Sequence, residues 1–350
     1  MIRSLLFLTF VCITCTATAG ERIVLIEQPK RITQSEIRKS AKAESEKNID
    51  GGYNADANVI DSFAVMEYQS YTGGRYVNQP IRFRLMTPDT LKPGKKYPLV
   101  IWLHGVGESG DDNARQLSHV QSTIEFLAGK NKLDMFVLAT QCPPDNTAWE
   151  VSLSDEGKGD APLVVLSEIL DAVIEEYPVD TQKLGVFGLC SGGTATWTLA
   201  DMHPNRFAAV VACTSAPAGV RPDSFRQTAV WAFNNKDDPV PYEQTERFVE
   251  MINEQGGNAY ISLRETGGHD SWSDALAKKK VLCWMTLQTL GQRGPPQEMV
   301  CRHRSAVPLF GMFVFPILIT VVALTVRCFY KPRFYRNGGR GSTSLHDDTT

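Results

Sequence analysis

The stretch Val186-Phe187-Gly188-Leu189-Cys190-Ser191-Gly192-Gly193 decides the fold. Its first residues are apolar and predict a buried strand, and its last residues are small and predict a sharp turn into a helix. Such a turn strains its central residue, and the residues two positions before and after must be small because strand and helix approach closely there. The stretch therefore predicts a strand, a tight turn that presents one side chain, and a helix.

Two residues compete for the tip of this turn, Cys190 and Ser191. With Cys190 at the centre, both flanking positions are glycines, Gly188 and Gly192. With Ser191 at the centre, one flanking position is Leu189, whose side chain would hold strand and helix apart. The spacing favours Cys190 as the presented side chain and leaves Ser191 at the tip as the alternative.

The chain around this turn alternates short apolar runs with helical patterns. Apolar residues recur at helical spacing over 166–177 and 248–252, between the runs. Continuous apolar runs are typical of a parallel sheet that is covered on both faces. The pattern predicts an α/β fold with a mostly parallel central sheet and helices on both faces. The expected strands are residues 99–103, 135–139, 184–187, 207–212, 230–233 and 260–263.

Polar and glycine-rich turns follow four of these runs. In an open parallel sheet, reactive side chains gather at the carboxyl ends of the strands, so these turns are the expected site. Taken in chain order, they supply Cys190 as a nucleophile, an aspartate in the 236–241 turn, and His269. This is the order in which a nucleophile, an acid and a histidine follow one another in one class of hydrolases.

Four motifs carry a resemblance to a known superfamily. They read LHGVGESG at 103–110, GLCSGG at 188–193, KDDPVP at 236–241 and GHDSW at 268–272. On these motifs, the chain from about residue 76 to residue 288 resembles the α/β-hydrolase superfamily. Within it, the chain is similar to secreted phospholipase/carboxylesterase-like and polyhydroxybutyrate-depolymerase-like esterases, and its G-x-C-x-G turn resembles that of dienelactone hydrolase.

The resemblance implies a role for each residue of the expected site. It implies Cys190 as the nucleophile, Asp237 as the acid and His269 as the base. A histidine partner and a helix N-terminus both favour the reactive thiolate form of a cysteine. The backbone N–H groups of Val106 and Ser191 would form the oxyanion hole, which binds the negative charge that develops on a carbonyl oxygen.

The acid has two candidates in the sequence. The family pattern D-x-x-V-P falls on Asp237 through Val240-Pro241, and the neighbouring Asp238 is the alternative. The family usually has His-Gly just before this loop, whereas this chain has Asn234-Asn235 and one residue fewer before the acid. We therefore expect the loop to position its acid differently from its relatives.

Two further features follow from the same resemblance. His104 is implied as a structural support of the oxyanion loop rather than as a catalytic residue. Residues 141–144 and Trp149 resemble a loop that lines the acyl or alcohol pocket, with a structural turn as the alternative.

Both ends of the chain carry targeting signals. Residues 1–19 combine one positive charge, a short apolar run and small residues, which predicts a cleaved signal peptide. Residues 306–326 are uncharged and long enough to span a bilayer, and the arginine- and lysine-rich tail predicts a cytoplasmic C-terminus. We expect a signal peptide (1–19), an N-terminal extension (20–75), a hydrolase domain (76–290), a linker (291–305), a transmembrane helix (306–326) and a cytoplasmic tail (327–350).

Composition and cysteine count narrow the functional classes. The net charge of −3 gives no basic field, so we exclude nucleic acid as a partner. The motifs of metal and phosphate sites are missing from the sequence, so we expect no cofactor. Of eight cysteines, five fall in the expected extracytoplasmic part, and an odd number predicts a free thiol or an intermolecular bridge.

These observations predict a membrane-anchored extracytoplasmic hydrolase of the carboxylesterase, lactonase or thioesterase type. Its partners would be a small-molecule, lipid or polymer ester substrate and the membrane that holds its C-terminal helix. One alternative is a binding protein on the same scaffold whose activity was lost with the serine. A peptidase is the weaker alternative, because thiol attack from such a turn suits amides poorly.

Overall fold

The computed structural model describes residues 22–29, 57–69, 81–88, 90–120, 134–144, 149, 162–278 and 281–292. The predicted signal peptide, the transmembrane segment 306–326 and the tail lie outside these residues. Within the described ranges, no helix is both long and apolar enough to cross a membrane.

A nine-stranded sheet forms the centre of the described chain, with strand order β1-β2-β3-β5-β4-β6-β7-β8-β9. Every pairing from β5 across to β9 is parallel, and β1, β2 and β3 add an antiparallel edge. The strands are β1 (Ile23–Glu27), β2 (Ala64–Tyr68), β3 (Ile81–Met86), β4 (Tyr97–Leu103), β5 (Phe136–Thr140), β6 (Val179–Leu189), β7 (Ala209–Cys213), β8 (Ala229–Asn235) and β9 (Asn258–Arg264).

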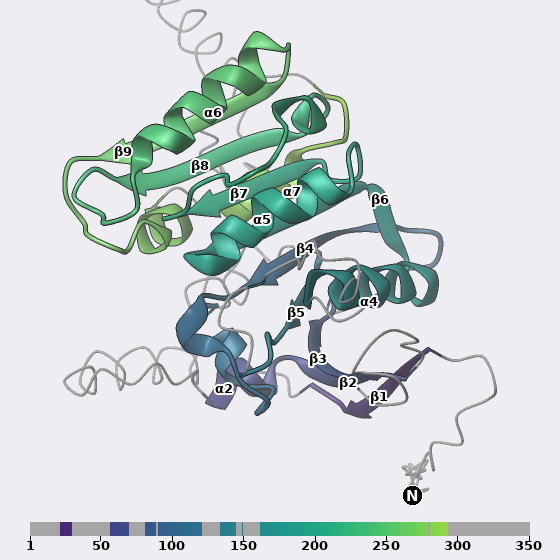
Figure 1. Ribbon diagram of the computed structural model, residues 1–350. Helices are drawn as coiled ribbons and strands as arrows, with labels where there is room; N and C mark the ends of the chain where they lie inside the picture. Colours follow the sequence, from purple (N-terminus) through teal and green to yellow (C-terminus); the bar gives the residue numbers. More distant parts are fainter. Residues whose placement is uncertain are drawn as a thin grey trace, which may run out of the picture. The chain divides into compact units, whose positions relative to one another are not determined.

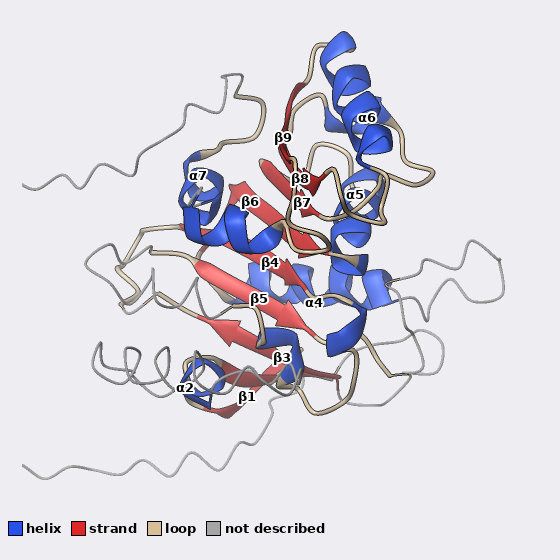
Figure 2. Cartoon of the chain, turned by 90° about the vertical axis from the view of Figure 1, so that its left-hand side faces the viewer, coloured by secondary structure: helices blue, strands red, loops and turns tan. Residues whose placement is uncertain are grey.

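Helices cover both faces of this sheet. Figure 1 shows α5 and α6 over its parallel part, and Figure 2 shows α4 and α7 on opposite sides of the strands. The helices are α2 (Ala57–Asp61), α4 (Pro162–Glu176), α5 (Ser191–Met202), α6 (Tyr242–Glu254) and α7 (Val281–Leu287). Short helical turns are η2 (Val106–Glu108), η3 (Arg115–Leu117), η4 (Pro222–Phe225) and η5 (Asp274–Lys278).

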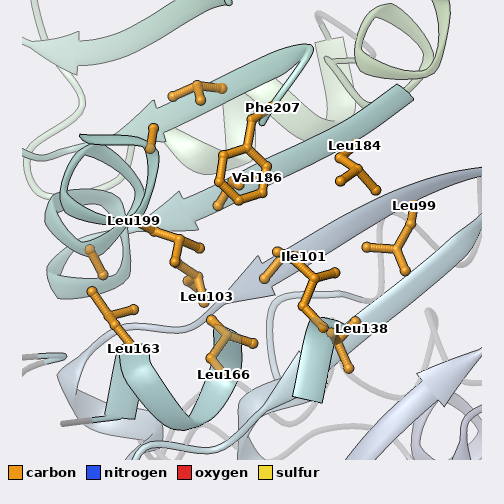
Figure 3. Close-up of a cluster of buried hydrophobic side chains, with 14 of the residues drawn as sticks. Leu99, Ile101, Leu103, Leu138, Leu163, Leu166, Leu184, Val186, Leu199 and Phe207 are labelled. Carbon is orange, nitrogen blue, oxygen red and sulfur yellow. The ribbon is translucent and has the colours of Figure 1, made fainter. Parts of the chain in front are cut away.

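The core has two parts because successive side chains of a buried strand point to opposite faces. In β4, Ile101 joins the cluster beneath α4, α5 and α6, whereas Trp102 joins the cluster beneath α7 and stacks on Phe187 at 4.5 Å. Figure 3 shows the first cluster, where β4, β5 and β6 meet α4 and α5. Burial on both faces explains why these strands read as continuous apolar runs.

All six predicted strands are present as β4 to β9, and the two helical patterns are α4 and α6. The antiparallel edge was not predicted. Strands β1 and β2 lie within residues 20–75, which we expected to be an extension outside the sheet. Their sequences, IVLIE and AVMEY, are five residues long, each includes a glutamate, and both lie in a mostly polar part of the chain, so they were not recognised as strands.

Candidate active site

Cys190 lies at the tip of the turn between β6 and α5, with φ 53° and ψ −122°. The turn can be this tight because the residues two positions before and after Cys190 are glycines. A Cβ on Gly188 would lie 2.1 Å from the carbonyl oxygen of Gly192, and a Cβ on Gly192 would lie 2.3 Å from that of Leu103. Only glycine fits at either place, so the register is set by close backbone approach.

Ser191 does not share this position. Its hydroxyl oxygen is buried and has no hydrogen-bond partner within the described residues. The Cys190 side chain is half-buried and a free thiol, and its N–H donates to the carbonyl oxygen of Cys213 at 3.0 Å. Of the two candidates, the structure places Cys190 at the tip.

The His269 ring lies between this thiol and a carboxylate. Its Nε2 is 3.2 Å from Cys190 Sγ, and its Nδ1 is 3.0 Å from Asp238 Oδ1. An ionised carboxylate can only accept, so Nδ1 carries the proton and donates it to Asp238. The lone pair of Nε2 therefore faces the thiol, where it can accept the S–H proton.

The carboxylate beside His269 belongs to Asp238 and not to Asp237, which was the preferred acid on sequence grounds. The side chain of Asp238 is fully buried, whereas that of His269 is 42% exposed. Asp238 Oδ1 also accepts from the Val240 N–H at 2.8 Å, and its Oδ2 has no partner within the described chain. This carboxylate holds the His269 ring in one orientation and fixes the proton on Nδ1.

Asp237 performs a different task in the same turn. Its two oxygens accept from the N–H groups of Gly267 and Gly268 at 3.1 and 2.8 Å. These backbone hydrogen bonds lower the pKa of Asp237 below its usual range. The carboxylate therefore holds the backbone that leads into His269 and does not reach the ring.

Contacts at the end of β8 show why Asp237 and Asp238 have different partners. Asn235 is completely buried at the end of β8, and its Nδ2 donates to the Gly268 carbonyl at 2.9 Å. A Cβ on Gly267 would lie 2.6 Å from that same amide nitrogen, so the glycine lets the two loops meet. Asn235 and Asp237 together fix the turn before His269, which leaves Asp238 facing the ring.

The predicted oxyanion donors lie on adjacent elements. Val106 begins η2 after β4, and Ser191 begins α5 after β6, while β4 and β6 pair in parallel up to Leu103 and Gly188. The N–H groups at helix starts have no partner in their own helix and attract negative charge. Val106 and Ser191 therefore both follow the carboxyl ends of neighbouring strands, at the edge of the sheet where Cys190 lies.

His104 supports the oxyanion loop, as the resemblance implied. Its Nε2 accepts from the Cys142 N–H at 2.9 Å, so the proton is on Nδ1, which donates to the Gly105 carbonyl at 2.6 Å. Burial lowers the pKa of His104 to about 4, which keeps the ring neutral. Trp149 Nε1 donates to the His104 carbonyl at 2.9 Å, so Trp149 also supports this loop.

A second histidine–carboxylate pair lies beneath the oxyanion loop. His119 Nε2 is 3.3 Å from Glu108 Oε1, and the Glu108 side chain is 4% exposed. Burial alone would raise the pKa of Glu108. The His119 hydrogen bond, the attraction of the two nearby histidines and the Gly105 N–H outweigh this effect, so the pKa lies below its usual value. Glu108 is an ionised group that holds the backbone just before Val106.

Trp272 connects the two histidines. Its ring meets His119 at 5.4 Å and His269 at 6.0 Å, edge to face in both cases. Glu108 and Trp272 lie inside the sequence motifs but had no predicted role, and His119 lies outside the motifs. The sequence could not indicate this role of His119, because its contact with Glu108 forms only when the chain after η3 folds back onto the loop after β4.

Other chemistry is limited in the described residues. Cys213 is a free thiol that is fully buried, and burial raises its pKa well above the usual value. Cys283 is disulfide-bonded. No group of three or more His, Cys, Asp or Glu side chains in the described chain is arranged to hold a metal ion.

The sheet and the thiol–histidine–carboxylate contacts at its carboxyl edge define an α/β-hydrolase. More particularly, the chain belongs to the Esterase family, described as "Putative esterase", whose profile matches residues 74–278, more than half of the chain. This is a family of ester-bond hydrolases.

Relatives agree with this assignment. The chain is 32% identical over 104 residues to "Probable acetylxylan esterase A" of Aspergillus fumigatus, covering 29% of this chain and 28% of the relative. It is also 32% identical over 87 residues to acetylxylan esterase A of Emericella nidulans, covering 24% of this chain and 28% of the relative. The matched segments thus span under a third of these relatives.

A solved structure is similar over a larger part of the chain. The crystal structure of a thermostable esterase aligns with a TM-score of 0.58 at 28% sequence identity, covering 66% of this chain and 64% of that one. An acylaminoacyl peptidase aligns with a TM-score of 0.50 at 13% identity, a likeness that shows the fold alone.

Proposed function

We propose that this chain hydrolyses carboxylic esters through a Cys190–His269–Asp238 triad. The observation that carries the proposal is the 3.2 Å contact between Cys190 Sγ and His269 Nε2, at a turn where only glycine fits on either side. A nucleophile, a base and an orienting acid in mutual contact are the requirements of covalent acyl transfer.

Acylation begins when His269 Nε2 takes the S–H proton and the sulfur attacks the ester carbonyl carbon. The carbonyl oxygen becomes an oxyanion, to which the N–H groups of Val106 and Ser191 would donate. The C–O bond of the alcohol then breaks, and His269 returns its proton to the leaving oxygen. The product of this step is a thioester between the acyl group and Cys190.

Hydrolysis reverses the roles. His269 removes a proton from water, the resulting hydroxide attacks the thioester carbonyl, and the acid leaves as the thiol regains its proton. Buried Asp238 stabilises the charged ring in both steps by accepting from Nδ1. A thiolate leaves the tetrahedral intermediate more readily than an amine does, so activated esters, lactones and thioesters suit this site better than amides.

The substrate class that the relatives support is an acetyl ester of a carbohydrate, since two of them are named for acetylxylan. The finer location is also a proposal. A cleaved signal at 1–19 and an uncharged span at 306–326 support an extracytoplasmic domain with a membrane anchor. Extraction of membranes with alkaline carbonate tests it, and release of the chain into the soluble fraction would contradict the anchor.

The function is tested with purified full-length protein on acetyl, lactone and thioester substrates. We expect turnover that falls at least about 10³-fold in Cys190→Ala and in His269→Ala. Intact-mass detection of an acylated Cys190 peptide would support the thioester. Equal turnover in wild type and Cys190→Ala would exclude the triad, and a much faster Cys190→Ser would indicate a silenced enzyme.

A further inference from the structure

Thr214 follows β7 and has a backbone conformation that its side chain disfavours. Its φ is 50°, and for a β-branched residue a positive φ is an outlier. The residue is buried, and its N–H donates to the Phe233 carbonyl at 2.8 Å. Strain of this kind persists only where the surroundings impose it, and it clusters at functional sites.

The next residue shows what imposes this conformation. The Ser215 carbonyl accepts from Asn234 Nδ2 at 3.3 Å and from Thr245 Oγ1 at 2.7 Å, and the Ser215 hydroxyl accepts from Trp197 at 3.2 Å. Three elements therefore fix the chain directly after Thr214. The turn cannot relax without breaking these hydrogen bonds.

The strained residue makes two hydrogen bonds to the loop that carries His269. The Ser271 N–H donates to Thr214 Oγ1 at 3.1 Å, and the two hydroxyl oxygens are 2.7 Å apart. Ser271 Oγ is also 2.7 Å from the Phe233 carbonyl, which can only accept. The direction is thus unique: Ser271 donates to Phe233, and Thr214 donates to Ser271.

The same residue adjoins the nucleophile turn. The carbonyl of the preceding Cys213 accepts the Cys190 N–H at 3.0 Å, and Ser271 lies two residues after His269. Thr214 thus lies between the backbone that presents the thiol and the backbone that presents the base. A change in its conformation or its hydroxyl would move one relative to the other.

We propose that Thr214 is a positioning residue, whose hydroxyl and left-handed backbone set the Cys190–His269 contact through Ser271. The inference rests on the proposed function, because kcat for ester hydrolysis is one of its two measurements. A glycine would adopt this backbone conformation without strain, but it has no hydroxyl to bind Ser271. The inference therefore predicts that threonine is needed here in spite of its strain. Positioning within a fraction of an ångström matters, since small misplacements of reacting groups cost large factors in rate.

The test compares Thr214→Gly and Thr214→Ser in the full-length protein. Glycine relieves the strain and removes the hydroxyl, so the two effects oppose each other and we expect Tm to stay within about 5 °C of wild type. We expect kcat to fall about 10- to 100-fold in Thr214→Gly with KM within about twofold. Thr214→Ser keeps the hydroxyl and should retain kcat within about threefold.

Two matched controls separate positioning from general stability. Asn205→Gly relieves a positive φ of 61° at an exposed residue away from the site. Thr228→Val removes a buried hydroxyl that donates to the Phe207 carbonyl at 2.8 Å, beyond the opposite end of β8. Both should leave kcat unchanged. Wild-type kcat in Thr214→Gly would overturn the inference, and so would an equal loss of kcat in Thr228→Val at a similar Tm.

A second readout does not require turnover. The pH profile of Cys190 alkylation by iodoacetamide, followed by peptide mass mapping, reports the thiol–histidine contact directly. We expect the Thr214→Gly profile to move toward that of His269→Ala, and an unchanged profile would overturn the inference. If wild type hydrolysed no ester but the profile moved, the proposed function would fail and the positioning role would stand.

Discussion

Two histidine–carboxylate pairs lie at the carboxyl edge of the sheet, and they do different work. His269 and Asp238 are 3.0 Å apart, with the ring 42% exposed and the carboxylate fully buried. His119 and Glu108 are 3.3 Å apart, with side chains 16% and 4% exposed. Trp272 meets both rings. Both pairs consist of an imidazole and a carboxylate, so the difference in their roles must come from the further group that each pair contacts.

That further group is Cys190 Sγ for one pair and the backbone at Gly105 for the other. An exposed ring with a thiol at 3.2 Å can exchange a proton with a reacting atom. The carboxylate of the second pair binds a backbone N–H, so we expect this pair to fix the loop after β4. The comparison shows that a carboxylate beside a histidine does not identify a catalytic acid until the other contacts of the pair are known.

The largest effect should separate Asp238 from Asp237. We expect Asp238→Asn to lower kcat about 10²- to 10³-fold, because the amide can no longer stabilise the charged ring and favours the wrong tautomer. Asp237→Asn should cost less than about tenfold, because that exposed side chain holds only the Gly267 and Gly268 N–H groups. Steady-state kinetics with an acetyl ester measures both.

The order of these two effects is the informative outcome. A larger loss in Asp237→Asn would return the acid to the position that the family pattern favours. It would also require that the acid loop rearranges when substrate binds.

A smaller effect is expected at the second pair. Glu108→Ala should lower kcat about tenfold with little change in KM, because the Val106 N–H loses its fixed direction toward the oxyanion. Glu108→Gln should retain most activity, since its amide oxygen still accepts from the Gly105 N–H. Binding of a trifluoromethyl ketone, whose adduct carries an oxyanion, should weaken in parallel with kcat/KM.

Glu250→Ala, on the exposed side of α6, is the matched control and should change neither value. If Glu108→Ala and Glu108→Gln were equally impaired, charge and not hydrogen bonding would be the contribution of this pair. Full activity in both would limit the pair to a role in stability.

The smallest effect is on stability, at the third histidine of the site. Burial depresses the folded-state pKa of His104 to about 4, while the unfolded value is about 6.5. The unfolded chain therefore binds more protons between these values, so the free energy of unfolding falls as pH drops through that window. The loss from this ring is about 3 kcal/mol between about pH 7 and pH 4.

Urea denaturation across this range measures the slope, and His104→Gln is the control because it cannot titrate. Burial also lowers the pKa of His203, so a residual slope of the same sign should remain in the variant. An identical slope in wild type and His104→Gln would show that His104 is accessible to protons in the folded state.

Most of the fold could be predicted from local patterns. Strands β4 to β8 are largely buried on both faces, and their sequences contain continuous apolar runs for that reason. Helices α4 and α6 show the period of a half-covered helix. Strand β1 is the exposed edge of the sheet, and β2 beside it is mostly buried although a glutamate interrupts its apolar residues. Their membership in the sheet is a long-range pairing, and nothing in five residues of sequence announces it.

The site divides in the same way. Glycine spacing alone selected Cys190 over Ser191, because steric exclusion of a Cβ acts within a few residues of the turn. The motifs alone located His269 and the two aspartates. Which aspartate faces the ring could not be derived, because Asp237 and Asp238 are adjacent and point to opposite sides of one turn.

The amino-acid sequence by itself determined the α/β architecture, the presented thiol and the loop that carries the base. Only the tertiary structure decided that Asp238 is the partner of His269, that Glu108 and His119 form a second pair, and that Thr214 joins the thiol and histidine loops. The physical reason is range. Periodicity and close backbone packing leave local marks, whereas a hydrogen bond between residues far apart in the chain depends on how the loops meet.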